Sequence, residues 1–383
     1  MSGSAQHTAF SHGPDNVSYK YKPLHEEDIR IVKFDTEASR DDLRLLSEHR
    51  PRGMEIPYYA LSYCWGDARV QKRITLDDQS FMVTSSLLEA LTALSAWLGP
   101  KHAYWIDAIC INQHDINERN SQVQQMWRIF SGAVRVVSWL GPDDHDTKAL
   151  FDAWTKAGNE TTEVDEAIVE RGIGAILSRP YFTRTWVIPE IMQARKIVLA
   201  CGSSYFPQRA MQAWLSMTSS ALRNRHELLL CSHLRRFSDL PKIALSSPFQ
   251  LNVVITAYES SSCSDPRDRV FAMLSDPGTV ALRPALWLKA DYSLTVEELW
   301  LEVMRQHTAL NLHHAWDQLA NDVSGFGSCL ADALGVRVRS EPFGRWLAQQ
   351  IGIAWQPDDC SSHVAVLKAG GVIMIGRALH PII

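Results

Sequence analysis

The chain has 383 residues, of which 46% are hydrophobic and 21% are charged. This composition is that of a globular protein and excludes a disordered or fibrous chain. The formal net charge of −5 gives no reason to expect a nucleic-acid partner, since phosphate binding needs a clustered basic surface. The densest basic stretch, 223–236, is interrupted by Glu227 and a run of leucines, which is typical of a solvated helix face.

The cysteines and the N-terminus bear on the compartment. The seven cysteines are odd in number and form no CxxC pair, which argues against a disulfide framework and a structural zinc site. Residues 1–16 lack the apolar core of a signal peptide, and no apolar run approaches the roughly 20 residues that span a bilayer. We therefore expect a cytoplasmic protein without a membrane span, and a disordered leader at 1–19.

Several apolar segments end at turn signals, as strands do. In chain order these predicted strands are 29–34, 58–65, 103–111, 134–140 and 196–201. A small hairpin is expected around Asp77-Asp78, because the apolar runs 74–76 and 81–83 flank this turn.

Other segments have apolar residues three and four positions apart, which predicts helices. In chain order these predicted helices are 86–98, 115–130, 145–157, 164–177 and 182–194. Capping boxes are expected to start the first two, at Ser86 with Glu89 and at Asp115 with Glu118. Pro189 is expected to kink or shorten the last.

The alternation of strands and helices predicts an α/β fold with right-handed crossovers and a three-layer parallel sheet. We expect a first domain over 20–205 and a mainly helical extension packed on it over 206–310. The remaining 311–383 are expected to form a C-terminal region with a β-hairpin, because apolar runs at 364–367 and 372–375 flank a Gly-Gly turn.

In an open α/β sheet, ligands bind beyond the carboxyl ends of the strands. We expect polar side chains from three segments to meet there and line a common recess. The candidate catalytic residues are Asp67, Asp107 and Glu190. The candidate ligand-binding residues are Trp65, Gly66, Asn112, Gln113, Arg119, Arg184 and Trp186.

Asp107 is the most informative candidate, because its neighbours in the predicted strand are apolar. Burial of an unpaired carboxylate costs several kcal/mol, so this group must be paired, hydrogen-bonded or protonated. One interpretation is a structural pair with an arginine such as Arg119 or Arg184. The other is a ligand-binding or acid/base role.

The other candidates also allow two interpretations each. Asn112-Gln113 precedes a predicted helix, whose free N–H groups could hold an anion or phosphate, but the loop could equally use these amides for its own hydrogen bonds. Glu190 shares a predicted helix with Arg184 and Trp186. A carboxylate beside an aromatic platform suits a sugar or a nucleotide, whereas an ion pair with Arg184 is equally simple.

Other kinds of chemistry have weaker support. Cys64 would need an oriented histidine to act as a nucleophile, and the nearest in sequence are His102 and His114. His313-His314 with Asp317 lacks a third metal ligand at suitable spacing, so we expect no metal. The sequence contains no GxGxxG, GxxxxGK[ST] or GxSxG motif, and we therefore expect no bound cofactor.

Three blocks resemble the heterokaryon-incompatibility (HET) domains of fungi. They are YALSYCWGD at 59–67, WIDAICINQ at 105–113 and RPYFTRTWVIPE at 179–190, within core motifs that cover 59–202. Pro189 stands where the family usually has glutamine. Outside this core, DPRDRVFAM at 265–273 and DYS at 291–293 resemble a block found downstream of such domains.

The resemblance implies a role in non-self recognition and programmed cell death, through self-association or contact with other cell-death signalling proteins. It also implies a flavodoxin-like order, since HET domains have been likened remotely to Toll/interleukin-receptor (TIR) domains, some of which cleave NAD. One alternative is therefore an enzyme that cleaves NAD or another small nucleotide, with NAD as its substrate. Another is a tailoring enzyme for a small fungal metabolite. Longer relatives also suggest a truncated C-terminal region.

Overall fold

The computed structural model describes most of the first 207 residues and shorter stretches after them. The described residues are 19–25, 27–37, 43–51, 56–99, 101–159, 165–207, 261–275, 288–311, 327, 330–335, 356–357, 365–368 and 372–375. Of the expected leader, only Tyr19 is described, and much of the expected extension 206–310 lies outside these ranges, as do His313, His314 and Asp317.

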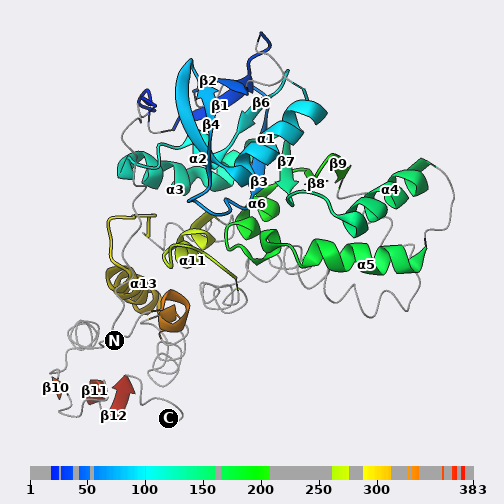
Figure 1. Ribbon diagram of the computed structural model, residues 1–383. Coiled ribbons are helices and arrows are strands. Elements are labelled where there is room, and N and C mark those ends of the chain that lie inside the picture. Colours follow the sequence, from blue (N-terminus) through cyan, green and yellow to red (C-terminus); the bar gives the residue numbers. More distant parts are fainter. Residues whose placement is uncertain are drawn as a thin grey trace.

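A nine-stranded sheet with the order β5-β4-β2-β1-β6-β3-β7-β8-β9 forms the centre of the fold (Figure 1). Its strands are β1 (Ile29–Phe34), β2 (Arg44–Arg50), β3 (Tyr58–Tyr63), β4 (Gln71–Leu76), β5 (Gln79–Thr84), β6 (Ala103–Trp105), β7 (Arg135–Trp139), β8 (Ile197–Cys201) and β9 (Ser204–Pro207). Together with the helices below, this confirms the α/β class.

The expected all-parallel sheet is wrong, because the sheet is mixed. The strands β6, β3, β7 and β8 pair in parallel, as do β2 and β4. The pairs β1-β2, β1-β6, β4-β5 and β8-β9 are antiparallel. Two of these, β4-β5 and β8-β9, are joined by two-residue turns, and such short connections permit only antiparallel neighbours.

The hairpin predicted around Asp77-Asp78 is confirmed. Both residues have positive φ, 47° and 60°, as the two central positions of a type I′ turn require. The Asp77 carboxylate also accepts hydrogen bonds from the Ser47 N–H and the Tyr19 hydroxyl, both at 2.7 Å. The turn therefore holds β2 and the start of the described chain in place.

Helices alternate with the later strands along the chain (Figure 1). They are α1 (Ser85–Trp97), α2 (Asp107–Cys110), α3 (Ile116–Gly132), α4 (His145–Asn159), α5 (Glu166–Leu177), η1 (Pro180–Thr183), α6 (Val187–Gln193), α11 (Asp268–Phe271), η2 (Met273–Ser275) and α13 (Val296–Asn311). No helix among the described residues is long and apolar enough to cross a membrane.

Of the two predicted capping boxes, only the cap at Asp115 is present, and its partner Glu118 accepts the Asn112 N–H in place of that of Asp115. Asp115 caps α3, where its carboxylate accepts the N–H groups of Asn117 and Glu118. The residue that caps α1 is Thr84, whose hydroxyl accepts the Leu87 N–H. Ser86 instead donates its hydroxyl to the carbonyl of Cys64 at 2.6 Å, which fixes the chain just after β3.

The predicted strand 103–111 is wrong beyond Trp105, since residues 107–110 form the short helix α2. The carbonyl of Ile106 accepts the N–H groups of Ile109 and Cys110, and the Asp107 carboxylate accepts the N–H of Ala108 at 2.7 Å. These local bonds replace strand pairing, which is the usual way a short polar side chain ends a regular element.

The predicted helix 182–194 is interrupted. Its first residues belong to η1, and α6 begins only at Val187. Pro189 lies in the first turn of α6, where a backbone N–H has no partner within the helix, so the ring is tolerated there. The break leaves Arg184 outside the helix of Glu190, whereas Trp186 is the N-cap of α6 and accepts the Glu190 N–H.

The core surrounds β3, which is buried over almost its whole length, and α6 packs against both β3 and α3. The segment 261–275 joins this region through a bridge between Arg184 and Ser262, and η2 contacts α3. Residues 356–357, 365–368 and 372–375 form a separate antiparallel sheet, in the order β10-β11-β12.

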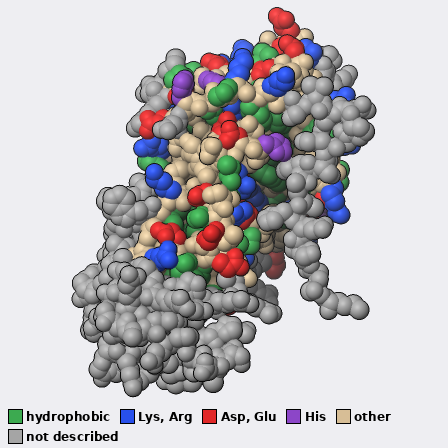
Figure 2. All heavy atoms as spheres, turned by 90° about the vertical axis from the view of Figure 1, so that its left-hand side faces the viewer, with side chains coloured by type: hydrophobic (Ala, Val, Ile, Leu, Met, Phe, Trp, Pro, Cys, Tyr) green, Lys and Arg blue, Asp and Glu red, His purple; other side chains and the backbone are tan. Residues whose placement is uncertain are grey.

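Charged side chains of both signs are interspersed over the face that Figure 2 shows, and its described part carries no broad basic patch. This mixture of signs accords with the small formal net charge of −5.

Candidate functional site

A cavity of about 470 Å³ lies beyond the end of β3, within the size range of ligand pockets. Seven of the candidate residues line it: Trp65, Gly66, Asp107, Gln113, Arg119, Arg184 and Trp186. Of the three acids expected to share one recess, only Asp107 lines the cavity. Asp67, Glu190 and Asn112 are not among the lining residues.

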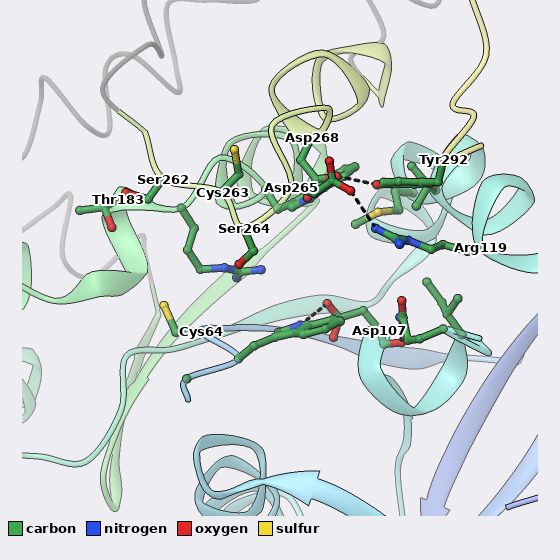
Figure 3. A pocket seen from close by; sticks show the side chains of 18 of the residues that line it. Cys64, Asp107, Arg119, Thr183, Ser262, Cys263, Ser264, Asp265, Asp268 and Tyr292 are labelled. Atoms are coloured by element: carbon green, nitrogen blue, oxygen red, sulfur yellow. Dashed lines mark hydrogen bonds and ion pairs between the residues drawn. The ribbon is translucent and has the colours of Figure 1, made fainter. Parts of the chain in front are cut away.

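The lower wall of the cavity is formed by residues just after β3 and at the start of α2, among them Trp65 and Asp107 (Figure 3). The indole Nε1 of Trp65 donates to the Asp107 carboxylate at 2.8 Å, and the Ala108 N–H donates to the same carboxylate at 2.7 Å. Desolvation by the surrounding walls raises the pKa of Asp107, although the nearby Arg184 and these hydrogen bonds act in the opposite direction. Asp107 is therefore a hydrogen-bonded acid exposed to the cavity.

Arg184 lies between the cavity and Glu190. Its guanidinium donates to the carbonyl of Tyr63 and lies 3.9 Å from the Glu190 carboxylate. Glu190 is only 2% exposed and accepts a hydrogen bond from Ser62. Burial raises the pKa of Glu190 to about 7, against the opposing effects of Arg184 and Ser62. Glu190 thus supports Arg184 from behind the cavity wall.

Asp67 faces solvent. Its carboxylate accepts the Nε–H and an Nη–H of Arg69 at 2.9 and 2.7 Å, and this pairing lowers the pKa of Asp67 to about 2. Because the geometry directs the group toward Arg69 and away from the cavity, Asp67 is not placed to share chemistry with Asp107.

Asn112 and Gln113 separate in the structure. The Asn112 side chain accepts the His114 N–H, and its own N–H donates to Glu118, so Asn112 stabilises the loop. Gln113 lines the cavity and donates to the carbonyl of Asp107 at 3.1 Å. Asp115 already caps the N-terminus of α3, and the bonds of Asn112 match the interpretation in which the loop uses its amides for its own hydrogen bonds.

The upper wall comes from residues 262–268 and from Tyr292, to which we assigned no site role from the sequence. The Tyr292 hydroxyl donates to Asp268 at 2.6 Å, and burial raises the pKa of Asp268 to about 6. Arg119 lies 3.5 Å from the centre of the Tyr292 ring and 3.8 Å from Asp265 (Figure 3). The downstream blocks DPRDRVFAM and DYS were the signal that could have identified this wall.

The cavity is lined by acids, guanidinium groups and indoles, and also by the thiols of Cys64 and Cys263. Cys64 lines it, but burial raises the pKa of this thiol, and no histidine is among the described lining residues. Within the described part of the chain, no cluster of His, Cys, Asp and Glu is arranged to hold a metal ion.

Comparisons with known proteins agree with the sequence blocks. Residues 58–190 match the family described as heterokaryon incompatibility protein (HET). The chain is similar to heterokaryon incompatibility protein 6, OR allele, of Neurospora crassa, at 28% identity over 265 residues. The similarity covers 56% of this chain and 39% of that relative, so the chain spans well under half of the relative's length. No solved structure matches.

Proposed function

We propose, on the basis of the HET domain that this chain carries over residues 58–190, that the protein is an effector of programmed cell death in non-self recognition. The name of the Neurospora relative, a heterokaryon incompatibility protein, supports this role. Self-association or contact with other cell-death proteins would carry the signal onward.

The main support for this proposal is that most of the residues that line the cavity lie within the matched region. Trp65, Asp107 and Arg184 all fall within residues 58–190 and line it together. A carboxyl whose pKa is raised, beside a guanidinium in a concave site, is a candidate functional arrangement. We therefore propose that the cavity binds a small ligand and that the cell-death activity depends on it.

Induced expression in a filamentous fungus tests this role. Wild-type protein should arrest growth, and Asp107→Asn should not, because the amide cannot replace the carboxylate in the cavity. Asp67→Asn is the matched control and should arrest growth like the wild type, since Asp67 lies outside the cavity. Normal growth despite soluble wild-type protein would refute the proposal.

A second candidate is cleavage of NAD or a related nucleotide. The observation that favours it is the combination of two indoles, Trp65 and Trp186, with Arg184 and Asp107 in one cavity. Indole rings stack on bases and sugars, and guanidinium groups bind phosphates. In this reading NAD is a substrate, and no resident cofactor is required.

Nicotinamide release from NAD by purified protein tests this second candidate. Release should be lost in Asp107→Asn and kept in Asp67→Asn. Absence of release by the wild type, also after forced oligomerisation, would exclude NAD cleavage.

A further inference from the structure

Two similar groups of side chains line the cavity from opposite walls. Each contains an aspartate that accepts a hydrogen bond from an aromatic side chain and lies near an arginine. In the first group, Asp107 accepts the Trp65 indole N–H and lies near Arg184. In the second, Asp268 accepts the Tyr292 hydroxyl and lies near Arg119.

We propose that the second group is half of the ligand site, with Asp268 as a ligand-binding acid opposite Asp107, and that the ligand carries both a ribose and a phosphate. This inference deepens the ligand-binding role proposed above and rests on it. It assigns a role to Asp268 and Tyr292, which lie outside the family match of 58–190.

The second group is built as firmly as the first. Asp268 is 8% exposed and accepts the Tyr292 hydroxyl at 2.6 Å. A carboxylate offers about four acceptor sites, so this bond leaves acceptor capacity. Because Asp268 also lines the cavity, that capacity is available to a ligand hydroxyl.

The two walls are held together by direct bonds. The Thr185 N–H donates to the Ser262 carbonyl at 3.0 Å, and the Ser262 N–H donates to Thr183. On the other side, the Asn120 side chain accepts the Tyr292 N–H at 2.9 Å. Within the upper wall, Arg267 donates to the Tyr292 carbonyl at 2.8 Å and so joins the two segments that form it. Asp268 and Tyr292 are therefore fixed relative to the HET domain and are not a loosely attached surface.

The chemistry of the cavity determines the ligand class. Carboxylates on opposite walls accept hydrogen bonds from vicinal hydroxyls, as a ribose offers. The rings of Trp65 and Trp186 provide apolar faces for a sugar or a base. Arg119 keeps its side chain 29% exposed, and its five N–H donors suit the oxygens of a phosphate.

Isothermal titration calorimetry of the full chain with ADP-ribose tests the inference. Wild-type protein should bind it saturably. Asp268→Asn should weaken binding at least about tenfold, the loss expected for one hydrogen bond to a charged group. Tyr292→Phe should weaken it in the same direction, because the hydroxyl that orients Asp268 is removed. Separate titrations with adenosine and with ribose 5-phosphate show how much of the affinity for ADP-ribose comes from the base and how much from the sugar phosphate.

The matched control is Glu297→Gln, since Glu297 is exposed at the start of α13 and should leave the affinity unchanged. Thermal unfolding of each variant separates a lost site from a lost fold. Should Asp268→Asn fail to fold, Tyr292→Phe and Arg119→Lys, which keeps the positive charge, carry the test.

Two results would overturn the inference: no saturable binding of ADP-ribose by wild-type protein, or unchanged affinity in folded Asp268→Asn. Failure of the proposed function appears elsewhere, as normal fungal growth on expression of a protein that still binds ADP-ribose through Asp268. Growth arrest without binding would instead leave the cell-death role intact and remove the second half of the site.

Discussion

Trp65 donates its indole N–H to Asp107 across 2.8 Å, and this bond joins the end of β3 to the start of α2. The two bonded residues are 42 positions apart in the chain and belong to different sequence blocks. The bond also lowers the pKa of Asp107 against the effect of burial, so Trp65 keeps this carboxyl closer to its ionised form.

Trp65→Phe removes the bond and keeps an aromatic ring. We expect it to reduce the free energy of unfolding by about 1–3 kcal/mol, because a buried acceptor loses its donor, and to abolish growth arrest. Urea unfolding and the fungal expression assay measure the two effects. An unchanged growth arrest would show that the state of Asp107 does not matter for activity.

The pH dependence of stability should depend on Glu190. Its pKa is about 7 in the folded protein, above the roughly 4.3 of an unfolded chain, so the folded state binds the proton more tightly between these values. As the pH rises, ionisation of Glu190 in the folded protein therefore lowers the free energy of unfolding. The full decrease, on the order of 3 kcal/mol, is reached only above pH 7.

The neutral isostere Glu190→Gln removes this cost. Urea unfolding at pH 5 and pH 8 should give similar stability for variant and wild type at pH 5, and a relatively more stable variant at pH 8. Glu297→Gln should show no such difference. A variant that is destabilised equally at both pH values would mean that Arg184 requires a charged partner throughout.

The turn between β4 and β5 offers a test of the fold alone. Asp78 has φ 60°, a conformation that glycine adopts more easily than aspartate. We expect Asp78→Gly to stabilise the protein by about 0.5 kcal/mol and Asp78→Val to destabilise it by about 1 kcal/mol or more. Thermal unfolding measures both, and equal effects of the two variants would contradict the turn geometry.

The buried pair of Arg30 and Glu118 should be essential for stability. Their side chains lie 2.9 Å apart and are 0% and 8% exposed, and Glu118 also accepts the Asn112 N–H. Glu118→Gln leaves Arg30 buried without a counter-ion, which typically costs about 3–5 kcal/mol. Chemical denaturation checks this, and a loss below about 1 kcal/mol would show that water reaches the guanidinium.

The sequence predicted the elements whose signals are local. The turn at Asp77-Asp78 and the cap at Asp115 depend on residues a few positions apart, and both were correct. The strand expected through Asp107 was wrong, because an apolar run does not distinguish a buried strand from a short buried helix. The mixed sheet depends on pairing between distant strands, which periodicity does not encode.

The candidate site was predicted in part for the same reason. Trp65, placed at the end of a predicted strand, does line the cavity, and so does Arg184, which was placed on a predicted helix. Asp67 does not, because its near neighbour Arg69 pairs with it. Asp268 was missed, because it is more than 150 positions from Asp107 in the sequence and only the folding of the chain brings both residues to the same cavity.

A crystal structure of the full chain with ADP-ribose would show whether Asp107 and Asp268 bind one ligand. We predict density in the cavity, with ribose hydroxyls within hydrogen-bond distance of Asp107 and Asp268 and a phosphate beside Arg119. Density elsewhere on the protein, or an empty cavity at saturating ADP-ribose, would contradict it.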